Sequence, residues 1–326
     1  MEQELQAASF ERAASAYASA VGGSMSGDSV RRITEGEGAK ILAMRTQDAE
    51  HAQTVFELGQ AGTRDWEQHS QIVAVAPIVD RASVSTDGVM IRIRGEDWKE
   101  VKITAFSRVS PSPRPNDQIT RQHPAHEPVI TLSAHSYQAV LDDADTMLKW
   151  QLAEGFGRGI FQCPVVTSPN DGAAWIERIT RTNFPHAVQI VDWAHASQHI
   201  YAAAKLTWPG QSDTAQAWSH TQLDKLWSGQ TQVVAATMSH LASPEAAKSA
   251  SYFADNLERM RYPDFRAQGR PIGSGTVESA AKTVIQHRLK RPCRGWNRDN
   301  ASAMIAALTE FHSDRLDLVR HAYCAC

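Results

Sequence analysis

Three acidic residues stand at places in this sequence where a carboxylate could take part in chemistry. Asp87 lies within a run of β-type residues, Asp171 follows a short apolar run, and Glu278 comes just after Gly273-Ser274-Gly275. A carboxylate inside a half-buried strand is unusual and costly to desolvate without a partner. Asp171 is predicted to lie just past the carboxyl end of a strand, where open α/β sheets place their ligands.

Together these carboxylates fit one chemistry, the displacement at a phosphodiester assisted by two divalent cations. Mg²⁺ prefers carboxylate and water oxygens and needs few protein ligands, and a pair of ions can activate the attacking oxygen and stabilise the leaving one. We therefore predict that Asp87, Asp171 and Glu278 are catalytic and hold two Mg²⁺ or Mn²⁺ ions. Each residue also has a structural interpretation: an Asp-Gly turn, a helix-capping turn, and a charge that complements a helix dipole.

A second acidic block offers an alternative to Asp171 as the second catalytic aspartate. Asp192 and His195 follow the next predicted strand, in Val191-Asp192-Trp193-Ala194-His195. The order of the strands favours Asp171, because it ends the fourth predicted strand and Asp192 the fifth. Asp192 and His195 are predicted to support the site, and a buried histidine that hydrogen-bonds Asp192 is the structural alternative.

Basic residues gather around the third carboxylate. Between 259 and 298 ten Lys and Arg residues stand against two acidic ones, a local charge of +8 in a chain whose net charge is −3. Such a segment can neutralise phosphates, although a charge run is often only a solvated surface. The predicted DNA contacts are Lys282, Arg288, Lys290, Arg291 and Arg294.

Composition narrows the class of protein. The chain has 326 residues, of which 42% are hydrophobic and 21% charged, values that are ordinary for a soluble globular protein. The sequence contains no apolar run of about 18 residues and no signal core at its start. Four cysteines, two of them at the very end, suit neither a disulfide framework nor a zinc site and fit a reducing cytoplasm.

The pattern of elements predicts an α/β fold with a mixed sheet flanked by helices. Strands are expected at 82–85, 89–93, 98–106 and 129–133, with a further β-type run at 72–75, and buried strands at 161–166 and 187–191. Helices are expected at 135–154, at 175–180, throughout 194–262, at 276–289 and at 300–323. Three tryptophans of the helical block, Trp208, Trp218 and Trp227, are predicted to be core residues.

Four ordered blocks resemble insertion-sequence transposases of the Kra group, relatives of the Mutator-like Asp-Asp-Glu transposases. The first is Val84-Ser85-Thr86-Asp87-Gly88 with the following 94–102 segment, and the second is Asn170-Asp171-Gly172-Ala173-Ala174-Trp175-Ile176. Asp192-Trp193-Ala194-His195 is similar to an Asp-x-x-His block of this family. The most specific block is Gly273-Ser274-Gly275-Thr276-Val277-Glu278-Ser279-Ala280-Ala281-Lys282, which continues to Trp296.

The resemblance implies an RNase H-like fold with an all-α insertion between the second Asp and the Glu. Residues 1–70 would be a helical region left from a DNA-binding domain, 71–193 the first part of the core, 194–270 the insertion and 271–326 the remainder of the core. It further implies cleavage and strand transfer at the ends of an insertion sequence, by a cytoplasmic, nucleoid-associated enzyme that binds double-stranded DNA and self-associates to join two ends. The alternatives are a nuclease without strand transfer and an inactive DNA-binding remnant.

Overall fold

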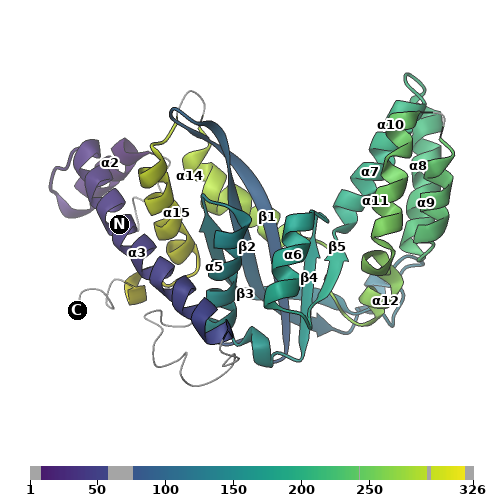
Figure 1. Ribbon diagram of the computed structural model, residues 1–326, viewed down its shortest axis with the longest axis horizontal. Helices are drawn as coiled ribbons and strands as arrows, with labels where there is room; N and C mark the ends of the chain where they lie inside the picture. Colours follow the sequence, from purple (N-terminus) through teal and green to yellow (C-terminus); the bar gives the residue numbers. More distant parts are fainter. Residues whose placement is uncertain (1–8, 58–75, 242, 292–294, 320–326) are drawn as a thin grey trace.

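A five-stranded mixed sheet forms the centre of the molecule (Figure 1). The computed structural model describes residues 9–57, 76–241, 243–291 and 295–319. The strands are β1 (Arg81–Ile93), β2 (Asp97–Ser112), β3 (Val129–Val140), β4 (Val165–Asn170) and β5 (Val188–Val191), in the order β3-β2-β1-β4-β5. The first three strands are antiparallel, whereas β4 is parallel to β1 and β5 to β4. The expected α/β class with a mixed sheet flanked by helices is confirmed.

Two of the predicted elements were wrong in position. Residues 135–140 belong to strand β3, not to a helix, and helix α5 begins only at Ala144. The buried polar residues Ser136 and Gln138 hid this strand, because their burial depends on a distant partner: Gln138 donates to Glu154 at 2.8 Å. The fourth strand is 165–170 rather than 161–166, and residues 160–162 form a 3₁₀ turn.

Several predicted boundaries also moved. The runs at 82–85 and 89–93 form one continuous strand, while the run at 72–75 lies outside the described residues. The final long helix, α15 (Arg298–His312), ends well before 323, at a turn in which Asp314 has a φ of 55°. The short helix α6 (Ala174–Asn183) and the strand β5 lie close to where they were expected.

Successive side chains of β1 point to opposite faces of the sheet, so each one packs into one of two layers of helices. Val84 packs with Phe106 and Phe184 on the side of α6 and of α5 (Ala144–Gly157). Val89, Ile91 and Ile93 point the other way, into the largest core cluster, together with Val277. That second layer contains α13 (Gly275–Ala280), the π-helical turn η4 (Ala281–Gln286), α14 (His287–Leu289) and α15.

The N-terminal part adds two helices to this second layer. Helix α2 (Phe10–Val21) precedes α3 (Gly27–Glu57), a 31-residue helix that crosses both α15 and α5 (Figure 1). Gly38 of α3 lies so close to α15 that a Cβ there would be 2.3 Å from the carbonyl oxygen of Ala303. Helix α3 is therefore part of the folded core around the sheet.

A bundle of helices stands beyond the β5 edge of the sheet (Figure 1). Its elements are α7 (Trp193–Thr207), α8 (Ser212–Trp227), α9 (Thr231–Ser239), α10 (Pro244–Ala247), α11 (Ser249–Asp255), η3 (Leu257–Met260) and α12 (Tyr262–Ala267). The bundle has a core cluster of its own, which includes Ile200, Val234 and Phe253. We call it the helical block.

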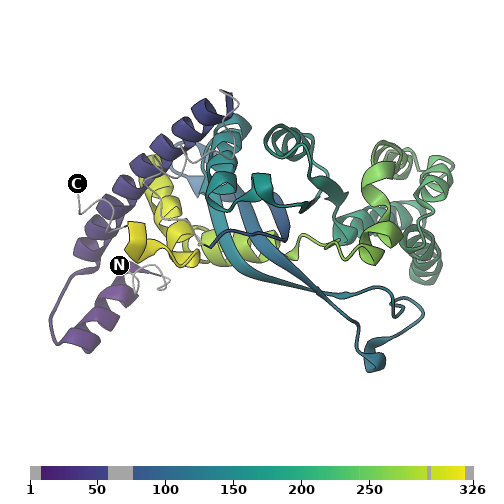
Figure 2. The same ribbon diagram turned by 90° about the horizontal axis from the view of Figure 1, so that it is seen from below.

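The β2–β3 hairpin extends past the sheet as an arm (residues 108–131) that reaches toward the helical block (Figure 2). Trp227 of α8 donates from its indole nitrogen to the carbonyl oxygen of Gln122 in the arm at 3.1 Å. Arg266 of α12 pairs with the buried Glu127 of the arm at 3.0 Å. The arm therefore ties the helical block to the sheet at a second place besides β5.

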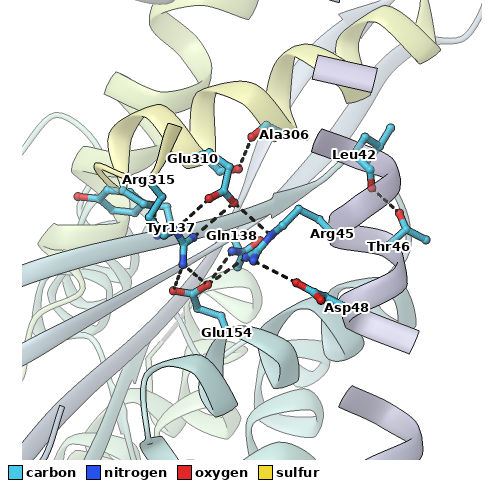
Figure 3. A network of polar contacts seen from close by, with 12 residues as sticks. Leu42, Arg45, Thr46, Asp48, Tyr137, Gln138, Glu154, Ala306, Glu310 and Arg315 are labelled. Atoms are coloured by element: carbon cyan, nitrogen blue, oxygen red, sulfur yellow. Dashed lines mark hydrogen bonds and ion pairs between the residues drawn. The ribbon is translucent and has the colours of Figure 1, made fainter. Parts of the chain in front are cut away.

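Buried charges hold the other side of the molecule together (Figure 3). Glu154 of α5 and Glu310 of α15 each pair with both Arg45 of α3 and Arg315, at distances of 2.9 to 3.1 Å. No side chain of the four is more than 3% exposed. This network joins three helices and, through Gln138, the strand β3.

Candidate active site

Asp87 lies half-buried near the middle of β1, opposite Ile103 of β2. Its side chain belongs to the same face as Val89 and Ile91, which is the face covered by α13. One oxygen, Oδ1, accepts the backbone N–H of Gly88 at 2.7 Å. A Cβ at Gly88 would be 2.2 Å from a carboxylate oxygen of Glu100, so the Glu100 side chain packs over this glycine.

Asp171 follows the last residue of β4, next to β1. Its Oδ1 accepts the N–H of Ala173 at 2.8 Å across Gly172, whose φ of +92° suits glycine. The preceding residue, Asn170, is buried and accepts the N–H of Thr86 at 2.7 Å. The Asn170 side chain joins β4 to β1 one residue before Asp87. Asp171, the residue after Asn170, therefore lies near Asp87 at the carboxyl end of β4.

Glu278 is exposed on α13, on the layer toward which Asp87 points. Its Oε1 is 3.1 Å from the hydroxyl of Ser274. The three predicted catalytic carboxylates therefore come from a strand, a strand end and a helix start that are far apart in the sequence.

The negative charges of Asp171 and Glu278 affect the pKa of Asp87. Burial raises the pKa of Asp87, the Gly88 N–H opposes that shift, and the negative charges of Asp171, Glu278 and Glu100 add to the rise. Such a shift arises when like charges lie near each other in a partly desolvated place. Asp171 and Glu278 are thus close enough to Asp87 for their charges to raise its pKa.

The three side chains fit Mg²⁺ in donor type, although they do not converge on one point. Among the described residues, no three His, Cys, Asp or Glu side chains are gathered into a metal-binding group. Each of Asp87, Asp171 and Glu278 has one oxygen in a local hydrogen bond, and no described residue hydrogen-bonds to the other. A cation would draw three such free oxygens together against their mutual repulsion.

Asp192 has a different environment from the other acidic residues. It is 2% exposed, and its Oδ1 accepts the N–H of His195 at 2.7 Å. Through this bond Asp192 caps the start of α7. Its Oδ2 accepts the N–H of Ser274 at 2.5 Å and lies 2.9 Å from the Ser274 hydroxyl. Both oxygens of Asp192 are therefore occupied, and the residue connects α7 to the loop that leads to Glu278.

The contact between Asp192 and His195 uses the backbone of the histidine. The His195 ring lies instead 5.2 Å from the ring of His199, between centroids, and 6.2 Å from that of Tyr252. His199 is stacked on Tyr252 at 3.9 Å. Burial lowers the pKa of His199, and the neighbouring His195 contributes to the shift.

Two residues at this site were not found from the sequence. Tyr252 of α11 donates its hydroxyl to the backbone oxygen of Asp171 at 3.1 Å, and Ser274 connects Asp192 to Glu278. Ser274 stands within a motif that was recognised, so its position was a usable signal. Tyr252 lies 81 residues beyond Asp171, in a helix with no motif around it, and only the tertiary contact identifies it.

The predicted DNA contacts differ in exposure. Lys282 and Lys290 are exposed, and Lys290 lies 5.6 Å from the centre of the Trp98 ring. Arg291 is intermediate. Arg288 is only 4% exposed and its guanidinium lies 4.0 Å from the Phe10 ring of α2. It therefore packs in the interior and is not presented to a phosphate as the two lysines are. Arg294 lies outside the described residues.

No family model matches the chain, and no curated protein matches it. The described part contains no helix long and apolar enough to cross a membrane.

Proposed function

We propose that this protein is a DNA transposase of the insertion-sequence type, with an RNase H-like core and a two-metal site formed by Asp87, Asp171 and Glu278. The observation that carries the proposal is the placement of the three residues. Asp171 follows the end of β4, which the hydrogen bond from the Thr86 N–H to Asn170 joins to β1 next to Asp87, and Glu278 lies on α13, which covers the face of Asp87. The strand order β3-β2-β1-β4-β5 and the helical block between the second aspartate and the glutamate support it, as do the four sequence blocks.

In this mechanism Asp87, Asp171 and Glu278 would hold the cations. Two bound Mg²⁺ ions supply activation of the attacking oxygen and stabilisation of the leaving oxygen. The exposed Lys282 and Lys290, which follow Glu278 along the same helical segment, bind phosphates of the duplex. Asp192 acts at a distance from the metals by keeping Ser274 and the start of α13 in place.

Hydrolysis of the phosphodiester by water leaves a free 3′-OH and a 5′-phosphate. The 3′-OH then attacks a phosphodiester of the target DNA, forms a new P–O bond, and the broken P–O bond releases a 3′-OH of the target strand. Joining two element ends requires two copies of the protein in one complex, so self-association belongs to the proposal. An RNase H-like nuclease would share the carboxylates and the first step, and would differ only by lacking strand transfer.

The test is metal-dependent cleavage and strand transfer with a labelled duplex that carries the element's ends, using wild type, Asp171→Ala and Asp192→Ala. We expect Asp171→Ala to lose cleavage and to lose less thermal stability than Asp192→Ala, since it removes one hydrogen bond. We expect Asp192→Ala to unfold at lower temperature and to keep weakened cleavage, since it removes hydrogen bonds and no metal ligand. The opposite ranking would assign the metal to Asp192.

Two further outcomes separate the competing functions. Cleavage by wild type without joining to target DNA would identify a nuclease. DNA binding without cleavage in Mg²⁺ or Mn²⁺ would identify an inactive remnant. Either result would overturn the proposal of a transposase.

A further inference from the structure

Tyr252 connects the helical block to the backbone of Asp171, a residue of the candidate active site. It lies on α11, and its hydroxyl donates to the backbone carbonyl oxygen of Asp171 at 3.1 Å. Its ring lies against Gly172, where a Cβ would be 3.4 Å from a ring carbon. The ring of His199, from α7, stacks on Tyr252 at 3.9 Å with an angle of 17° between the planes.

These contacts act on the peptide that sets the direction of the Asp171 side chain. Asp171 stands between the end of β4 and the left-handed Gly172, so no regular strand or helix pairing fixes its backbone. Its carbonyl oxygen accepts the tyrosine hydroxyl, while its Oδ1 accepts the N–H of Ala173. Rotation of this peptide would change the direction in which the Asp171 side chain leaves the backbone.

The hydroxyl is a durable donor. Burial raises the pKa of Tyr252 far above its usual value, and the nearby charge of Asp171 adds to the rise. A phenol is protonated at neutral pH, so the hydroxyl has a proton to donate there. The stacked His199 ring and Gly172 limit the ring to one place, so little side-chain freedom is lost when the bond forms.

We propose that Tyr252 is a positioning residue for the metal site: it holds the Asp171 peptide so that the carboxylate faces Asp87 and Glu278. This inference rests on the proposed function. It gives the helical block a direct effect on cation affinity, since displacement of α11 would release the Asp171 turn.

A matched control exists in the same helical block. Tyr262 of α12 donates its hydroxyl to the backbone oxygen of Val191 at 3.0 Å, so it makes the same kind of bond to the end of the neighbouring strand β5. Val191 precedes Asp192, whose oxygens are already occupied. Tyr262→Phe therefore removes an equivalent bond without touching the Asp171 turn.

The experiment measures Mn²⁺ binding directly by calorimetry, in the absence of DNA, for wild type, Tyr252→Phe and Tyr262→Phe. Loss of one hydrogen bond corresponds to about a 2- to 10-fold change in an equilibrium constant. We expect the dissociation constant for Mn²⁺ to rise by about that factor in Tyr252→Phe and to stay at the wild-type value in Tyr262→Phe. At sub-saturating Mn²⁺ the cleavage rate of Tyr252→Phe should fall in step with the loss of Mn²⁺ affinity.

A second variant approaches the same turn from its other side. Gly172→Ala places a side chain at a left-handed φ beside the Tyr252 ring, and it should also weaken Mn²⁺ binding while circular dichroism shows a folded protein. Equal Mn²⁺ affinity in wild type and Tyr252→Phe would overturn the inference and leave the transposase proposal intact. An equal loss in Tyr262→Phe would also overturn it, because the effect would then be general loosening. Failure of wild type to bind Mn²⁺ would overturn both proposals.

Discussion

The surroundings of Asp87 disfavour its ionised form, and the pKa of this carboxyl group is raised. It is half-buried in β1, and the carboxylates of Asp171, Glu278 and Glu100 add their negative potential to the effect of burial. The folded protein therefore binds a proton at Asp87 more tightly than the unfolded chain does. Ionised Asp87 destabilises the fold at neutral pH, and this destabilisation disappears as the pH falls below the unfolded value of 3.8.

We predict that Asp87→Asn raises the melting temperature at pH 7 without metal by about 1–3 °C. The amide keeps an oxygen that can accept the Gly88 N–H, and it removes the charge. The gain should shrink toward zero as the pH is lowered through the raised pKa of Asp87 to below 4, and the variant should lose metal-dependent cleavage. Thermal unfolding in EDTA across this pH range measures the first effect.

Asp117, an exposed residue of the arm, supplies the comparison. Asp117→Asn should leave both the melting temperature and cleavage at wild-type values. A lower melting temperature for Asp87→Asn at pH 7 would mean that the carboxylate stabilises the fold instead of serving the site.

At the scale of elements, the buried network of Arg45, Glu154, Glu310 and Arg315 holds α3, α5 and α15 at one crossing (Figure 3). Burial alone would raise the pKa of Glu154, but the charges of Arg315 and Arg45 outweigh it and hold the pKa below its usual value. The stability that Glu154 contributes is present above the unfolded value of 4.5 and is lost as the pH falls through the lowered folded pKa.

We predict that Glu154→Gln destabilises the protein by about 3–5 kcal/mol at pH 7, because two buried arginines then lose half of their neutralising charge. Urea unfolding at pH 7 measures this loss. The difference between wild type and variant should narrow in acid, as wild type itself becomes protonated at Glu154.

Asp145, which also lies on α5, forms an exposed ion pair with Arg178 at 2.6 Å. Asp145→Asn should change the urea midpoint little, because surface ion pairs contribute weakly. If Glu154→Gln were as mild as this control, the network would not be what joins the three helices.

At the scale of the whole molecule, the arm and the helical block hold each other. Arg266 of α12 pairs with Glu127 of the arm, donates to the backbone oxygen of Trp227 at 3.1 Å and lies 3.6 Å from the centre of the Trp227 ring. Gly269, with a φ of +65°, lets the chain pass close to Pro111 and Pro128 of the arm. The expected helical block is thus attached to the sheet through a hairpin that precedes it in the sequence.

We predict that Arg266→Ala loosens the arm, since it leaves Glu127 buried without its partner. Hydrogen exchange of the amides in residues 113–128 should become about 10- to 100-fold faster, while exchange in β1 and α15 stays unchanged. Arg121→Ala, at an exposed site on the same arm, is the control and should leave exchange as in wild type. Unchanged exchange in Arg266→Ala would show that the arm is held by other contacts.

Local patterns in the sequence were sufficient for the class of fold and for part of its order. The alternation of 98–106, the short apolar run that became β5 and the helix signals around 276–289 were read correctly, because each depends on neighbours in the chain. Prediction failed where polar residues are buried by distant partners. Ser168 and Asn170 of β4 bond to Val84 and Thr86 of β1, and Gln138 of β3 bonds to Glu154, so these strands do not look apolar.

The sequence by itself determined which residue types are available for chemistry: carboxylates after glycine-rich or strand-like runs, and lysines beyond Glu278. Tertiary structure alone decided how they are used. It bound Oδ2 of Asp192 to Ser274, turned Arg288 inward against Phe10, and brought Tyr252 to the Asp171 peptide. The physical reason is that hydrogen-bond partners, burial and the sum of nearby charges are properties of positions in space, and residues separated by 80 or more in the chain set them.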